Sequence, residues 1–220
     1  MNKREILKKC ALFNKLPEKQ IDDIAQISFQ KSYGRGEAVF FEGDEGNGFY
    51  LVASGKVKIY KMSPGGKEHI LHIFGPVEPF GEVPVFHGQP FPASAECLSR
   101  TETLFFPRDS FVGLIHGNPS IALNMLAVLS LRLRRFTTQI ENLSLKEVPA
   151  RLAEYLLYLQ EEQNGKETVE LEISKGQLAS LLGTIPETLS RILAKMSEEG
   201  LIAVNGRRIT LLDREGLLFR

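Results

Sequence analysis

The stretch that decides the fold runs from Ser174 to Glu199 and reads SKGQLASLLGTIPETLSRILAKMSEE. Ser174 followed three residues later by Gln177 has the spacing of a capping box, which begins a helix. Gly183 suits the end of that short helix, and Pro186 is tolerated at the first position of the next one. The stretch therefore predicts two short helices joined by a tight turn, which is the helix-turn-helix pattern.

The second of these helices is expected to present polar side chains outward once its apolar stripe is buried. The polar residues near its start are Glu187, Thr188, Ser190 and Arg191. A glutamate can accept a hydrogen bond from cytosine N4, and an arginine can donate two to guanine, so we expect this face to contact DNA bases. The simpler interpretation is that Glu187 and Arg191 form only a surface ion pair. That interpretation does not explain the short preceding helix and the glycine turn.

Directly downstream, residues 201–212 read LIAVNGRRITLL and predict a β-hairpin with its turn at Asn205-Gly206. Basic side chains near the hairpin and the two helices would contact phosphates. The residues expected to do so are Lys175, Lys195, Arg207 and Arg208. From Ser174 to Arg214 there are six basic and four acidic residues. This small excess leaves open a second hypothesis, a ligand-binding module whose C-terminal domain binds protein rather than DNA.

Upstream, residues 121–143 predict one long helix with a narrow apolar seam. Apolar residues recur there at alternating steps of four and three, at Ala122, Leu126, Leu129, Leu133, Phe136, Ile140 and Leu143. This alternation is typical of a coiled coil and favours a dimer interface formed by the six seam residues from Leu126 to Leu143. Packing of the helix along its own domain is the alternative. Arg132, Arg134 and Arg135 lie off the seam, so we expect them on a solvated face.

From residue 30 to residue 106 the pattern changes to short β-branched and aromatic runs separated by glycine-containing turns. Such spacing predicts an antiparallel barrel or sandwich of about eight strands. Residues 5–27 predict two or three short helices interrupted at Pro17. The expected domains are therefore residues 1–118, the helix and hinge at 119–145, and residues 146–220.

The composition excludes several classes of protein. Basic and acidic residues balance at 27 each, and 43% of the chain is hydrophobic, which is typical of a globular protein. Cys10 and Cys97 are too few for a disulfide scaffold or an iron–sulfur cluster. Targeting and membrane-spanning segments are not evident, so we expect a cytoplasmic protein with no membrane partner. Phosphate-loop, zinc-protease and hydrolase motifs are also lacking, so an enzyme is not expected.

Taken together, the chain resembles the superfamily of the cyclic-AMP receptor protein and FNR, bacterial transcription regulators. The residues that carry the resemblance are Phe41-Glu42-Gly43-Asp44, Phe49-Tyr50-Leu51-Val52, Ser54-Gly55, Phe80-Gly81-Glu82, Arg151-Leu152-Ala153 and Glu187-Thr188-Leu189-Ser190-Arg191. The resemblance implies an α+β fold with a cyclic-nucleotide-binding-like antiparallel β-roll, a long dimerisation helix and a C-terminal winged helix-turn-helix. It also implies a homodimer whose partners are double-stranded DNA, RNA polymerase and a small-molecule effector. The Glu-Thr-x-Ser-Arg motif resembles the FNR type, which implies a TTGA-like inverted repeat.

The resemblance also identifies an effector cassette, although this cassette departs from the cyclic-AMP pattern. Cyclic-AMP readers place an arginine about ten residues after the Gly-Glu pair, where this chain has Pro92, and a small hydroxyl residue where it has Phe136. An unpaired phosphate is costly to bury, so cyclic AMP is disfavoured. The expected pocket residues are Phe80, Gly81, Glu82, His87, Pro92, Ala93, Ser94 and Phe136. The cassette resembles that of the haem-associated, nitric-oxide-responsive branch, in which His87 would be the axial ligand; an exposed loop histidine is the alternative.

Overall fold

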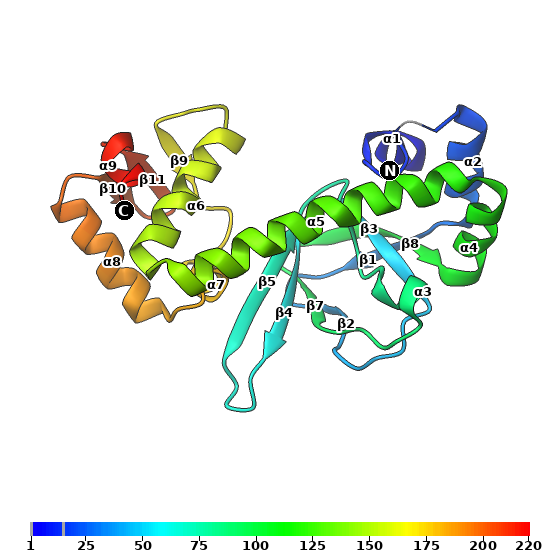
Figure 1. The fold of residues 1–220 in the computed structure, drawn as a ribbon, viewed down its shortest axis with the longest axis horizontal. Helices are drawn as coiled ribbons and strands as arrows, with labels where there is room; N and C mark the ends of the chain where they lie inside the picture. Colours follow the sequence, from blue (N-terminus) through cyan, green and yellow to red (C-terminus); the bar gives the residue numbers. More distant parts are fainter. Residues whose placement is uncertain (1, 15) are drawn as a thin grey trace. The chain divides into compact units, whose positions relative to one another are not determined.

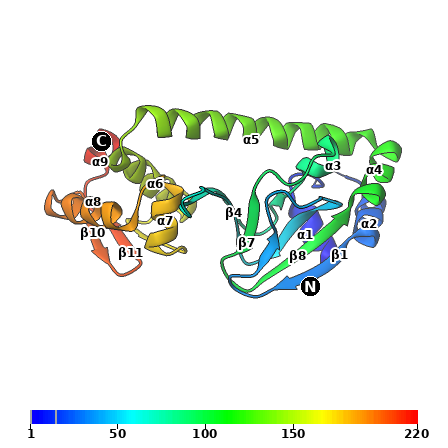
Figure 2. The same ribbon diagram turned by 90° about the horizontal axis from the view of Figure 1, so that it is seen from below.

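The chain divides into two compact units, residues 1–134 and 135–220, which meet within the long helix α5 (Pro119–Leu145). The computed structural model in Figures 1 and 2 describes residues 2–14 and 16–220, with the side chains of residues 139, 142 and 143 left out. No single described helix is long and apolar enough to cross a membrane. One bent pair, Arg108–Gly117 with Pro119–Thr138, reaches that length and composition only when its two members are combined.

The first unit begins with two short helices, as predicted, α1 (Lys3–Lys9) and α2 (Glu18–Ile27). Lys3 Nζ donates hydrogen bonds to the carbonyl oxygens of Ser28, at 2.6 Å, and Ala25, at 3.4 Å. Because the last carbonyls of a helix have no partner inside it, an ammonium group is stabilising at this end. Lys3 therefore joins α1 to the C-terminal end of α2.

The β-roll of the first unit consists of two four-stranded antiparallel sheets in the described residues. Their strands are β1 (Phe29–Tyr33), β2 (Ala38–Phe40), β3 (Gly48–Ser54), β4 (Val57–Met62), β5 (Glu68–Phe74), β6 (Pro79–Phe80), β7 (Ser94–Cys97) and β8 (Thr101–Pro107). The sheets have the orders β1-β8-β3-β6 and β2-β7-β4-β5. The predicted eight-stranded antiparallel domain is thus confirmed. Helix α3 (Val83–His87) lies in the connection between β6 and β7.

Strand β3 separates two apolar cores. Successive side chains of a strand point to opposite faces, and here both faces are buried. Phe49 and Leu51 pack into a core with the N-terminal helices, α4 (Arg108–Gly117) and the start of α5. Tyr50 and Val52 pack into the interior of the β-roll. This arrangement accounts for the uninterrupted apolar run of the strand.

The second unit contains three main helices and a three-stranded sheet. Its elements after α5 are α6 (Val148–Glu162), β9 (Thr168–Glu170), α7 (Lys175–Leu181), α8 (Pro186–Glu198), β10 (Ile202–Asn205), β11 (Arg208–Leu211) and α9 (Arg214–Leu218). The sheet order is β10-β11-β9. The helix-turn-helix with an adjacent β-hairpin is confirmed.

The hairpin turn lies one residue further along the chain than predicted. Asn205 and Arg208 form the last pair of the hairpin, so the two turn residues are Gly206 and Arg207. Gly206 has a φ of +62°. A two-residue turn with a positive φ at its first position takes glycine there, and this requirement sets the register.

Candidate DNA interface and effector cassette

The capping box begins helix α7 as predicted. Ser174 Oγ accepts from the Gln177 amide at 3.2 Å, and Gln177 Oε1 accepts from the Ser174 amide at 2.8 Å. Two donors at the helix start are thereby satisfied. The turn that follows passes through Gly183, whose φ is +68°, and helix α8 begins with Pro186 at its first position. These local interactions fix where the two helices begin and end.

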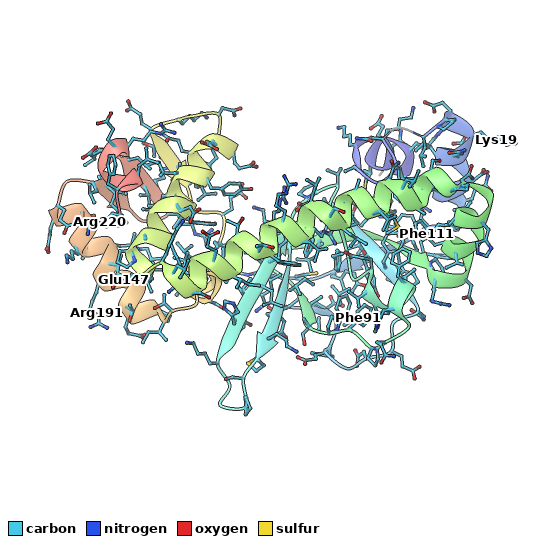
Figure 3. The ribbon with its side chains drawn as sticks, viewed as in Figure 1. Lys19, Phe91, Phe111, Glu147, Arg191 and Arg220 are labelled. Atoms are coloured by element: carbon cyan, nitrogen blue, oxygen red, sulfur yellow. The ribbon has the colours of Figure 1, made fainter. Side chains whose placement is uncertain are left out.

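Helix α8 has one buried face and one polar face. Its buried residues are Leu189, Leu193 and Met196. Among the residues predicted to contact bases, Glu187, Ser190 and Arg191 are exposed, and Thr188 is half-buried. Figure 3 labels Arg191 on α8. Arg191 Nη2 donates to Thr188 Oγ1 at 3.2 Å. Its remaining N–H groups can donate to a base edge.

The four basic residues predicted to contact phosphate are all exposed. Lys175 is the first residue of α7 and Lys195 lies in the last turns of α8, while Arg207 and Arg208 occupy the hairpin turn and the start of β11. Cationic side chains therefore lie on both elements of the motif and on the hairpin beside it. This is the distribution that positions a winged motif on a duplex backbone.

Aromatic rings, including those of the cassette residues Phe80 and Phe91, fill the interior of the β-roll. We call Phe40, Tyr50, Phe74, Phe80 and Phe91 the ring cluster. The Phe40 and Phe91 rings stack with centroids 3.7 Å apart, and the Tyr50 and Phe80 centroids are 5.3 Å apart. Gly81, with a φ of +72°, lies so close that a Cβ there would be 3.1 Å from the Phe40 ring. The Gly-Glu turn therefore depends on glycine for both conformation and space.

Glu82 of the cassette pairs with Arg132 of α5. The Arg132 guanidinium donates to Glu82 Oε1 and to the Pro79 carbonyl oxygen, and it lies 5.0 Å from the centroid of the Phe74 ring. The two side chains are only 10% and 17% exposed. The prediction that Arg132 lies on a solvated face is therefore wrong.

The reason is a second stripe on α5. Ile121 and Met125 are buried, and Val128 packs against the same core. Arg132 is the next residue at this spacing of four and three, so it faces the roll as well. The sequence contains this second stripe, but the seam is more regular and favoured the wrong placement of Arg132.

The other cassette residues lie in different environments. Phe91 and Ala93 are buried and Pro92 is exposed. Ser94 Oγ accepts from the Glu42 amide at 3.0 Å. Lys61, an exposed residue of β4, donates to the Pro92 carbonyl oxygen at 2.9 Å and pairs with Glu42. The Lys61 ammonium group is thus held outside the ring cluster.

The remaining predicted site residues are not brought into the ring cluster. His87 is exposed at the C-terminal end of α3. In the described residues, no group of three or more His, Cys, Asp and Glu side chains is arranged to hold a metal ion. Phe136 belongs to the second unit, where it is 44% exposed, and its role in the pocket stays a prediction.

Both cysteines are buried free thiols. Burial raises the pKa of Cys10 to about 11 and also raises the pKa of Cys97. The thiolate is the form that binds metal, and at neutral pH neither of these two thiols is in that form.

Most of the described seam residues of α5 are exposed. Leu126, Leu133, Phe136 and Ile140 are all exposed, and Leu129 is half-buried. The Leu143 side chain lies outside the described residues. A row of large apolar side chains in water is unfavourable and indicates a surface that a partner covers.

Comparison with known proteins identifies the same two parts. Residues 30–118 match the cyclic nucleotide-binding domain family, and residues 150–219 match the Crp-like helix-turn-helix domain family. The chain is 31% identical over 220 residues to the CRP-like cAMP-activated global transcriptional regulator of Mycobacterium tuberculosis, covering 98% of each chain. It is 35% identical to the cyclic AMP receptor protein of Thermus thermophilus, covering 89% of each.

A solved structure agrees with these matches. DNR from Pseudomonas aeruginosa is 34% identical, with a TM-score of 0.52, over 97% of this chain and 95% of the other. These similarities span both the β-roll and the helix-turn-helix. The chain is therefore a member of the CRP/FNR family of DNA-binding transcription regulators, and it is not an enzyme.

Proposed function

We propose that the chain acts as a homodimer, joined along α5, which binds a TTGA-like inverted repeat in response to a small-molecule effector other than cyclic AMP. The observation that carries the DNA part is the exposed polar face of α8, with Glu187 and Arg191 on a helix whose other face is buried. The exposed seam on α5 supports the dimer.

A dimer suits the DNA that we propose. An inverted repeat has two-fold symmetry, and two recognition helices about 34 Å apart fit successive turns of one face of the duplex. Each α8 would then contact one TTGA half-site through Arg191 and Glu187, while the hairpin arginines contact phosphates. RNA polymerase, the partner expected for this family, would respond to the bound dimer in the cytoplasm.

The effector cassette supports a ligand other than cyclic AMP. A cyclic phosphate needs a cationic fork inside the pocket. The segment from Phe91 to Glu96 has no cation, and Arg132 is already paired with Glu82. The two relatives described as cyclic-AMP proteins make cyclic AMP the competing candidate.

Haem fits the described residues poorly. The proposed axial ligand, His87, is exposed on a five-residue helix, and phenyl rings fill the roll interior. The proposed function therefore does not include haem. Binding of haem, which the resemblance to the nitric-oxide-responsive branch implies, is one of the outcomes that the spectra below distinguish.

The DNA part is tested by fluorescence anisotropy with a TTGA palindrome and with duplexes changed at single half-site positions. Arg191→Ala should weaken binding to the palindrome about 10- to 100-fold and relax discrimination at one base. Arg214→Ala is the matched control, because Arg214 is exposed but lies outside the recognition helix and the hairpin turn. Unchanged sequence preference in Arg191→Ala would remove the assigned role of that residue.

The effector part is tested by calorimetric titration of the full chain with cyclic AMP, which should give no saturable binding. Saturable binding at a 1:1 ratio per chain would make cyclic AMP the effector.

Absorption spectra with added haem should show no band that depends on His87. A Soret band that is lost in His87→Ala would replace the proposal with a haem sensor.

A further inference from the structure

Helix α3 exposes an apolar surface that the proposed function does not use. Val83 and Phe86 are 43% and 47% exposed, while Pro84 and Val85 on the opposite side are buried. From Val83 to Ala95 the sequence contains no Asp, Glu, Lys or Arg, in a chain in which these make up 25% of residues. Depletion of charge with exposed aromatic residues is typical of the centre of a protein–protein interface.

This surface lies on the side of α5 toward which the seam points. Asn124 Nδ2 donates to the Leu12 carbonyl oxygen at 3.0 Å, so Asn124 faces the N-terminal segment. At about 100° per residue, Leu126 and Leu133 lie about 160° to 180° around the helix from Asn124. Figure 1 shows α1 on one side of this part of α5 and α3 on the other, and Figure 2 shows α3 next to the same part. The seam and α3 therefore share a side.

Hydrogen bonds fix α3 at both ends. Arg132 binds the Pro79 carbonyl oxygen and Glu82, directly before the helix. Arg108 Nε donates to the Val85 carbonyl oxygen at 3.0 Å, and the helix ends at Gly88 with a φ of +68°. A surface that is already ordered loses little entropy when a partner covers it.

We propose that α3 is a second part of the dimer interface, in which Val83 and Phe86 of one subunit pack against α5 of a second copy of the chain. This inference rests on the proposed function, because pairing along the seam brings the partner's helix to this side. Under two-fold symmetry the same contact forms twice. The surface of α3 lacks Asp, Glu, Lys and Arg and lies on the seam side of α5, so the apolar helix of a second copy fits it better than a charged partner.

The proposed contact links the cassette to dimerisation. Helix α3 follows Glu82 directly, so an effector that displaces the Glu82–Arg132 pair also moves Val83 and Phe86. A small shift at the cassette is thereby transmitted to the subunit contact, as in other two-state interfaces. The dimer dissociation constant is then coupled to effector binding.

Sedimentation equilibrium of the full chain tests this inference. The double variant Val83→Ser/Phe86→Ser should raise the dimer dissociation constant about tenfold or more. Phe29→Ser is the matched control, because Phe29 is 58% exposed on β1, and it should change the constant less than about twofold. A wild-type dissociation constant in the double variant would overturn the inference about α3.

A seam variant separates this inference from the proposed function. Leu126→Ser/Leu133→Ser should dissociate the dimer in the same assay. If it does so while the α3 variant stays dimeric, the proposed function stands and the α3 contact falls. A wild-type chain that sediments as a monomer at every concentration overturns both.

A cross-linking experiment covers the case in which the α3 variant fails to fold. Benzoylphenylalanine replaces Phe86 in an otherwise unchanged chain, and isotope-labelled and unlabelled chains are mixed before illumination. Cross-links from position 86 to α5 of the other chain support the contact. Cross-links confined to the same chain overturn it.

Discussion

The two units of the molecule use arginine in opposite ways. In the first unit Arg132 is 17% exposed, donates to Glu82 and to a carbonyl oxygen, and lies over the Phe74 ring. In the second unit Arg191 is exposed, and its hydrogen-bond partner among the described residues is a neutral group, the Thr188 hydroxyl at 3.2 Å. The first guanidinium is already occupied by its own chain. The second retains donors for an external ligand.

This difference separates internal coupling from recognition. A buried pair costs desolvation energy that the mutual attraction only partly returns, so it acts mainly by holding two elements in one arrangement. An exposed arginine costs little to keep in water and gains its interaction on binding. We therefore expect substitutions in the roll to change folding and substitutions in the second unit to change DNA binding.

The largest effect should come from the ring cluster. Phe40 is 7% exposed and stacks on Phe91, whereas its neighbour Phe41 is 56% exposed. Phe40→Ala should lower the free energy of unfolding by about 3–5 kcal/mol through lost burial and a cavity. Phe41→Ala should cost less than about 1 kcal/mol. Urea unfolding followed by circular dichroism measures both, and equal losses would contradict the placement of Phe40.

A smaller effect is expected at the buried ion pair. Glu82→Ala leaves the Arg132 guanidinium without its carboxylate and should lower the free energy of unfolding by about 2–3 kcal/mol. Glu18→Ala removes an exposed carboxylate that pairs with Lys8 at 2.6 Å, and should lower the free energy of unfolding far less than Glu82→Ala does. The contrast between a buried and an exposed ion pair would fail if both variants lost the same small amount in urea unfolding.

The smallest effect is expected at the hairpin. Arg207→Ala should weaken DNA binding by a similar factor on every sequence and reduce the slope of log affinity against log salt by about 1. Anisotropy titrations at several salt concentrations measure this slope, with Arg214→Ala as the control. A change in base preference, with the slope unaltered, would show that Arg207 contacts bases.

Local signals in the sequence were enough to predict the second unit. The capping box at Ser174, the glycine at 183 and the proline at 186 each act within a few residues, so the boundaries of α7 and α8 followed from spacing alone. The hairpin register was the exception. It depends on which residue takes the positive φ, and the structure assigns that to Gly206 as the first turn position.

The first unit was less predictable, because the ion pair between Glu82 and Arg132 joins positions that are distant in the sequence. Strand periodicity gave the antiparallel β-roll, but no local pattern relates residue 82 to residue 132. The packing of Ile121 and Met125 onto the core shows which side of α5 faces the roll. With two apolar stripes on one helix, periodicity alone does not indicate which stripe is buried within the chain and which is left for a partner.

The lysine that joins α1 to α2 has a practical consequence for handling the protein. Lys3 is the third residue of the sequence, yet its ammonium group donates to the carbonyl oxygens of Ser28 and Ala25. Trimming those first residues, or displacing them with a fused purification tag, would remove the Lys3 hydrogen bonds and leave the Ala25 carbonyl only its bonds from Ser28. A tag joined after Arg220 leaves this bond intact.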